Sequence, residues 1–175
     1  MGLSVESMAI EMPAVHGHPN RASFRGVLTV VDVASDKAPA GSRGHRVLLT
    51  RRAAEAAMPS LMGMGLDYSP AFDRHDARRK IGVITRADIV GRVIEVGGFL
   101  YARDFPEIVQ EIGRPAGKRA SFPASLGLGM SYEIADAQVE DMTASVWVLN
   151  KVTFTGAAVL RRDKAAYRST WIEMG

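Results

Sequence analysis

The feature that most constrains the fold is a series of short segments rich in β-branched and apolar residues, separated by glycine and proline. Residues 23–33 (SFRGVLTVVDV), 80–86 (KIGVITR), 89–102 (IVGRVIEVGGFLYA) and 145–160 (SVWVLNKVTFTGAAVL) have the composition of strands. Short helical patterns lie between them, one beginning after the candidate N-cap Thr50, but strands and helices never alternate regularly. This pattern predicts an α+β, mainly β fold: an antiparallel β-barrel or sheet of six to seven strands with two to three short peripheral helices.

Chain length and composition predict one folded domain. A chain of 175 residues that is 47% hydrophobic suits a single core. Residues 1–20 contain Pro13 and Pro19 and show no sustained period, so we expect a flexible N-terminal extension followed by one domain over residues 21–175. No apolar run approaches the roughly 20 residues of a membrane-spanning helix, so we expect a soluble protein without a membrane partner.

Several classes of function receive no support from the residues. The chain has no cysteine, which excludes disulfides and thiol catalysis. Its net charge is only +3, and its arginine pairs lack interleaved aromatic residues, so nucleic-acid binding is not expected. His16 and His18 flank a glycine without a further cluster of ligands, so no metal site is predicted. No phosphate-binding or dinucleotide-binding motif is present either, and we expect no cofactor.

His75 is the histidine with the most suggestive setting. It lies in the polar segment 69–82 (SPAFDRHDARRKIG), between Asp73 and Asp76. Histidine is the side chain that gains and loses a proton near neutral pH, and a loop running into a strand leaves its ring partly accessible. A surface histidine without chemical function fits the same pattern, so this observation alone leaves both interpretations open.

Ser131 ends the glycine-rich segment 127–131 (GLGMS). Glycines before a serine let a substrate approach the backbone and leave N–H groups free to bind an oxyanion. Glu133 stands where a lipase-type nucleophile elbow requires glycine, so an α/β-hydrolase is excluded. Taken alone, a serine in this setting more often has a structural role at the start of a strand.

The order of these segments carries more information than either residue. A strand and a helix precede the loop of His75, which leads into Ile81 and Gly82. Two strands and a helix follow, then the segment that ends on Ser131, and finally an apolar strand running into residues 154–158 (FTGAA). Over about residues 21–167 this order resembles the prohead proteases of tailed phages, which share fold and chemistry with the herpesvirus capsid-maturation protease.

The resemblance implies roles for five residues. Ser131 takes the place of the nucleophile and His75 that of the general base. Backbone N–H groups near Gly129 take the place of the oxyanion site. Arg161 and Arg162 follow the last core strand as an arginine pair does in the herpesvirus enzymes, where it helps to bind the oxyanion.

The third catalytic residue has no direct counterpart in this sequence. The herpesvirus enzymes orient the base with a second histidine, but no histidine follows His75 in this chain. The phage enzymes tend to use an acid, yet the matching strand reads Asn-Lys-Val-Thr over residues 150–153. We assign Asp141 to this role, and the alternatives are Glu140, Asp136 and Asp76.

The resemblance also implies a biological setting. It implies a serine endopeptidase, without metal or cofactor, that cleaves scaffold or capsid protein segments, and often itself, during prohead maturation. Its partner would be the major capsid protein or its scaffolding segment, and its location the host cytoplasm, inside the immature capsid. A homodimer is familiar in the herpesvirus branch. The alternatives are a catalytically inactive capsid-assembly protein with a protease-like fold and, on charge alone, a nucleic-acid-binding β-domain.

Overall fold

A computed structural model describes residues 7–13, 15–114 and 127–175 of the chain. Its strands and helices, in chain order, are β1 (Ser7–Ala9), β2 (Ala22–Val30), β3 (Arg46–Leu49), α1 (Arg51–Ala57), the 3₁₀ turn η1 (Met58–Leu61), β4 (Gly65–Tyr68), β5 (Lys80–Val90), β6 (Val93–Leu100), α2 (Pro106–Gly113), β7 (Leu128–Val139), β8 (Val146–Arg161) and β9 (Trp171–Met174). The mainly β prediction with short helices is therefore confirmed.

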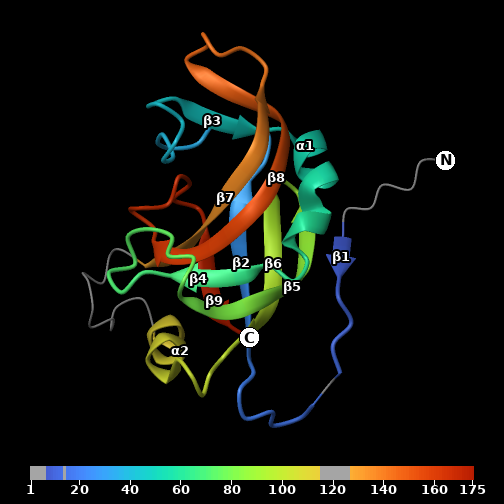
Figure 1. Ribbon diagram of the computed structural model, residues 1–175, viewed down its shortest axis with the longest axis vertical. Helices are drawn as coiled ribbons and strands as arrows, with labels where there is room; N and C mark the ends of the chain where they lie inside the picture. The colour runs from blue at the N-terminus through green and yellow to red at the C-terminus, as the bar shows by residue number, and fades with distance from the viewer. Residues whose placement is uncertain (1–6, 14, 115–126) are drawn as a thin grey trace, which may run out of the picture.

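The described strands form one curled sheet that wraps into a half-barrel, with the two helices at its periphery (Figure 1). Seven strands follow in the order β3-β8-β4-β5-β6-β2-β9, while β1 is added to β5 and β7 to β8. Most strand pairs are antiparallel as expected, but the sheet is mixed. Both β3 and β4 pair in parallel with β8. They run in the same direction because α1 and η1, which connect them, carry the chain back between the two strands.

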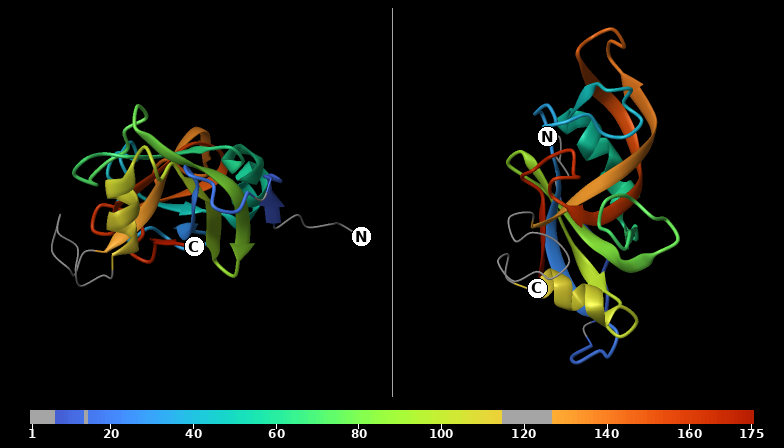
Figure 2. Two further views of the ribbon diagram at one scale, coloured as in Figure 1. Left: turned by 90° about the horizontal axis from the view of Figure 1, so that it is seen from below. Right: turned by 90° about the vertical axis from the view of Figure 1, so that its left-hand side faces the viewer.

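Strand β8 organises the sheet. It is 16 residues long, and its first half pairs with β3 while its second half pairs with β4. Along its other partner, β7, it forms a long antiparallel hairpin whose tip projects beyond the rest of the sheet (Figures 1 and 2). The three strands β4, β8 and β7 thus lie next to one another, which matters for the site below.

A local sequence signal explains where α1 begins. The Thr50 hydroxyl accepts a hydrogen bond from the backbone N–H of Ala53, so the predicted N-cap of α1 is confirmed. After β8, residues 162–166 form turns and bends rather than a helix. The chain then adds β9, which pairs with β2. None of the helices in the described residues has the length and apolar character needed to cross a membrane.

Part of the expected N-terminal extension belongs to the sheet. Residues 7–9 form β1 and pair with residues 86–88 of β5, and Ile10 donates a backbone hydrogen bond to Thr85. Residues 1–6 and 14 lie outside the described part of the chain, so the extension prediction is not tested there.

Candidate active site

The pairing of three strands places Ser131 and Asp67 in one row of the sheet. Ala158 of β8 is the register partner of Ser131 in β7 on one side and of Asp67 in β4 on the other. Residues in register project to the same face, and neighbouring strands are about 4.8 Å apart. The Cα atoms of Ser131 and Asp67 are therefore roughly 10 Å apart, with the small side chain of Ala158 between them.

His75 is carried by the loop that joins β4 to β5, and this loop is held by its own polar groups. The Ser69 hydroxyl donates to Asp73 Oδ1 at 2.7 Å and accepts the backbone N–H of Asp73 at 3.1 Å. Phe72 has a positive φ of 49° and a buried side chain, and its carbonyl accepts the N–H of Arg161 at 2.8 Å. The loop is thereby attached to the end of β8, which holds His75 over the sheet.

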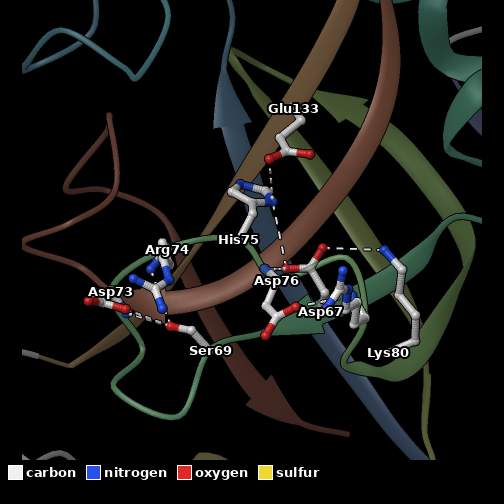
Figure 3. Close-up of polar contacts among 9 residues, drawn as sticks. Asp67, Ser69, Asp73, Arg74, His75, Asp76, Lys80 and Glu133 are labelled. Carbon is white, nitrogen blue, oxygen red and sulfur yellow. Dashed lines mark hydrogen bonds and ion pairs between the residues drawn. The ribbon is translucent and has the colours of Figure 1, made fainter.

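The imidazole of His75 lies between two carboxylates (Figure 3). Its Nδ1 is 3.7 Å from Asp67 Oδ1 and 3.8 Å from Glu133 Oε1, and its side chain is 15% exposed. Neither ring nitrogen has a hydrogen-bond partner among the residues that the structure describes. Because both carboxylates face Nδ1, the second nitrogen, Nε2, is left for another group.

Asp67 is a buried carboxylate that stays ionised. Its side chain is 1% exposed. Burial acts to raise the pKa of Asp67, but the His75 ring, the backbone N–H of Asp76 and the Lys80 ammonium together outweigh it and hold that pKa below its ordinary value. The Asp76 N–H donates to Oδ1 at 3.0 Å and Lys80 Nζ to Oδ2 at 3.3 Å. These bonds leave Asp67 Oδ1 oriented toward the imidazole (Figure 3).

Glu133 is the exposed counterpart of Asp67. It follows Ser131 by two positions on β7, so both side chains project from the same face, and the Glu133 side chain is 51% exposed. Its register partner is Gly156. A Cβ atom at Gly156 would lie 2.9 Å from Glu133 Oε2, so the missing side chain lets Glu133 lie flat against β8 and reach His75.

Ser131 and His75 line the same cavity, which has a volume of about 510 Å³. Both residues therefore border one cavity, while the two ring nitrogens of His75 are themselves buried. Its lining residues come from the loop before β3, from β3, from the β4–β5 loop, from β7 and β8, and from the segment that follows β8: Pro39, Ala40, Gly41, Ser42, Val47, His75, Ser131, Tyr132, Glu133, Ile134, Ala137, Val139, Trp147, Leu149, Thr155 and Ala166.

The acids expected as the third catalytic residue lie elsewhere, with one indirect exception. Asp141 lies in the turn between β7 and β8, where its carboxylate accepts the backbone N–H and the hydroxyl of Thr143. Glu140 and Asp136 are exposed, and Asp136 occupies an irregular part of β7 with φ of 53°. Asp76 contributes its backbone N–H to Asp67, while its carboxylate binds Arg79.

The expected oxyanion residues have structural partners. A Cβ atom at Gly129 would lie 2.6 Å from Thr170 Oγ1, so glycine is required there by close packing. Arg161 is the register partner of Leu128, on the face opposite Ser131, and binds Asp163 through two contacts of 3.0 Å. Arg162 differs: its Cγ packs beside Gly129, on the face that carries Ser131, but its guanidinium lies beside Gly127 and Nε donates to the Leu128 carbonyl.

The sequence interpretation missed Asp67. Its only signal is an aspartate within the otherwise apolar strand segment GLDY, where an unpaired charge would be costly. The structure also brings in Glu133, which the sequence offered only as an argument against a lipase elbow. No group of three or more potential metal ligands occurs within residues 7–13, 15–114 and 127–175.

Comparison of the chain with protein-family models and with curated proteins gave no match.

Proposed function

We propose that this protein is a serine endopeptidase with Ser131 as nucleophile, His75 as general base and Asp67 as the residue that orients the base. The observation that carries the proposal is the row Ser131–Ala158–Asp67, with His75 above it and its Nδ1 toward the buried acid. A nucleophile, a base and an orienting acid arranged in that order form the constellation that activates serine in unrelated folds.

In the proposed acylation step, Ser131 Oγ attacks the carbonyl carbon of the scissile peptide bond. His75 Nε2 takes the hydroxyl proton, and the imidazolium that forms is stabilised by Asp67 at Nδ1. The tetrahedral intermediate then collapses, the C–N bond breaks, and His75 returns the proton to the leaving amine. The products of this step are the amine fragment and an ester on Ser131.

Deacylation follows the same route with water as nucleophile. His75 takes a proton from water, the hydroxyl group attacks the ester carbonyl, and Ser131 leaves with the proton returned from His75. In both steps the oxyanion needs donors. Of the two candidate arginines we assign Arg162. Its Cγ packs beside Gly129 on the face of Ser131, and its guanidinium turns from Gly127 toward Ser131 in the complex, whereas Arg161 is held by Asp163.

The biological role that we propose rests on the order of segments shared with phage prohead proteases. In that role the enzyme cleaves scaffold or capsid protein segments inside the immature capsid, in the host cytoplasm. Its partner is the major capsid protein or its scaffolding segment, and the enzyme acts as a monomer or homodimer. The steps above require only side chains of this chain and water.

The test is labelling with a small fluorophosphonate, which reacts with activated serines, followed by mass spectrometry of the intact chain and its peptides. We expect one label, located on Ser131, which is lost in Ser131→Ala and strongly slowed in His75→Ala. The exposed Ser145 provides the matched control, since Ser145→Ala should label like the wild type. Absence of labelling in the folded wild type would refute the proposal.

One observation favours the second candidate, an inactive capsid-assembly protein. Neither ring nitrogen of His75 has a hydrogen-bond partner among the described residues, so Ser131 Oγ does not hydrogen-bond to His75 in this structure. Catalytic hydrogen bonds are often long before substrate binds and shorten in the complex. Co-expression with the cognate scaffolding segment separates the two candidates. An active protease cleaves the segment as the wild type but not as Ser131→Ala, whereas an inactive assembly protein cleaves it in neither form.

A further inference from the structure

The cavity beside Ser131 lies over a face of the sheet to which β3, β8 and β7 all contribute. Val47 of β3 is the register partner of Trp147 in β8, and Val139 of β7 is that of Leu149, and all four line the cavity. Among the described strands β7 pairs only with β8, so its other edge carries no neighbouring strand. Apart from the Met130 N–H, which donates to Thr170 Oγ1, this edge offers backbone donors and acceptors to an added chain.

Apolar side chains form most of the cavity wall, although Ser42, Glu133 and Thr155 line it as well. Its walls include Val47, Ile134, Val139 and Leu149, and Trp147 completes them. Trp147 is held in place, because its ring stacks on His45 at 4.5 Å between centroids and its Nε1 donates to the Met142 carbonyl at 3.2 Å. A rigid aromatic wall among aliphatic side chains favours a bulky apolar group over a charged one.

We propose that this cavity determines substrate specificity. An extended peptide pairs with the free edge of β7 and places a bulky apolar side chain in the cavity, close to the scissile bond. The inference rests on the proposed peptidase and adds its substrate class. Backbone pairing with an open strand edge supplies affinity, and a pocket for alternate side chains supplies specificity. A volume of about 510 Å³ is in the usual range for ligand sites, so the cavity has room for an apolar side chain and the adjacent residues of the peptide.

The chain offers a matched pair of variants. Ala137 is exposed and lines the cavity, whereas the next residue, Gln138, is exposed and does not line it. Ala137→Asp therefore puts a carboxylate into the cavity, and Gln138→Asp puts the same charge just outside it. Because both positions are exposed, neither change buries a charge.

The experiment is cleavage of a mixed peptide library by the purified full chain, read by mass spectrometry. We expect enrichment of Leu, Ile, Val, Met or Phe at one or two fixed positions within about four residues of the cut. A pair of peptides that differ only by Leu or Lys at the enriched position is then compared. In Ala137→Asp the ratio of kcat/KM for Lys over Leu should rise about fivefold, the effect of an exposed ion pair, while Gln138→Asp leaves it unchanged.

Fluorophosphonate labelling of Ser131 separates failure of this inference from failure of the proposed function. If Ser131 labels normally but the cuts show no apolar enrichment, or the library is not cut at all, the specificity inference is wrong and the activated serine stands. The same holds if Ala137→Asp and Gln138→Asp shift the ratio equally. If Ser131 does not label, both proposals fail.

Discussion

Replacing Asp67 by asparagine tests the proposed site most directly. The change keeps the shape of the side chain and an oxygen for the Asp76 N–H, but removes the charge next to His75. At an effective dielectric constant of about 20, a charge pair at the 3.7 Å separation of Asp67 and His75 is worth about 4.5 kcal/mol. Since each 1.36 kcal/mol is about tenfold in rate, Asp67→Asn should lower kcat/KM about 10³-fold.

Glu133 gives the internal comparison. It lies at a similar distance, 3.8 Å, but its side chain is 51% exposed. In an environment close to water its interaction with the imidazolium is worth about 1 kcal/mol, so Glu133→Gln should cost about fivefold. The two acids are therefore expected to differ about 200-fold in effect, although their distances to Nδ1 are nearly equal.

The assay is steady-state cleavage of one peptide selected from the library, with circular dichroism to show that each variant is folded. Asp141→Asn is the control, because Asp141 is bound to Thr143 in the hairpin turn. Its kcat/KM should match the wild type. The reasoning is refuted if folded Asp67→Asn keeps more than about a tenth of the activity, or if Asp141→Asn loses more than Asp67→Asn does.

Three predictions concern the fold. A Cβ at Gly98 would lie 1.9 Å from the Val83 carbonyl oxygen, so Gly98→Ala should lower the free energy of unfolding by about 3 kcal/mol or more in urea titrations, against under about 1 kcal/mol for Gly97→Ala, whose nearest contact is 3.4 Å. Thr50→Ala removes the cap of α1 and should cost about 1 kcal/mol; an unchanged urea midpoint would contradict this. The pKa of Asp67 is lower in the folded chain than its ordinary value of 3.8, so its ionised form stabilises the fold above that pH, and the stabilisation is lost as pH falls through the folded pKa. Acid titrations should therefore show a weaker loss of stability in Asp67→Asn than in the wild type.

The sequence predicted what depends on local patterns. Strand segments rich in β-branched residues and the cap at Thr50 follow from the preferences of neighbouring residues, and the structure confirms both. The pairing of β4 with β8 is of another kind, because a parallel pair depends on contacts between segments far apart in the chain. Asp67 becomes a partner of His75 only through that pairing and the loop that follows it, so no local signal could assign its role.

The same limit explains the choice of Asp141. Without the register of β7 and β8, every acid after Ser131 is an equal candidate for reaching His75. The register places Asp141 at the far turn of the hairpin and Glu133 on the face of Ser131. A single aspartate in an apolar strand was the available clue, and it identifies a buried charge without naming its partner.

The two parts of the site differ in what holds them in place. Ser131 and Asp67 are separated by two strand spacings, a distance that the backbone ladders on either side of Ala158 maintain. His75 stands on a loop, where a few side-chain bonds decide its position. The sheet therefore fixes the distance between Ser131 and Asp67, whereas the position of His75 can change with the conformation of its loop. In a complex with a covalent inhibitor, we expect β4 and β7 to superimpose on the free enzyme, and the imidazole to make the movement that closes the distance to the nucleophile.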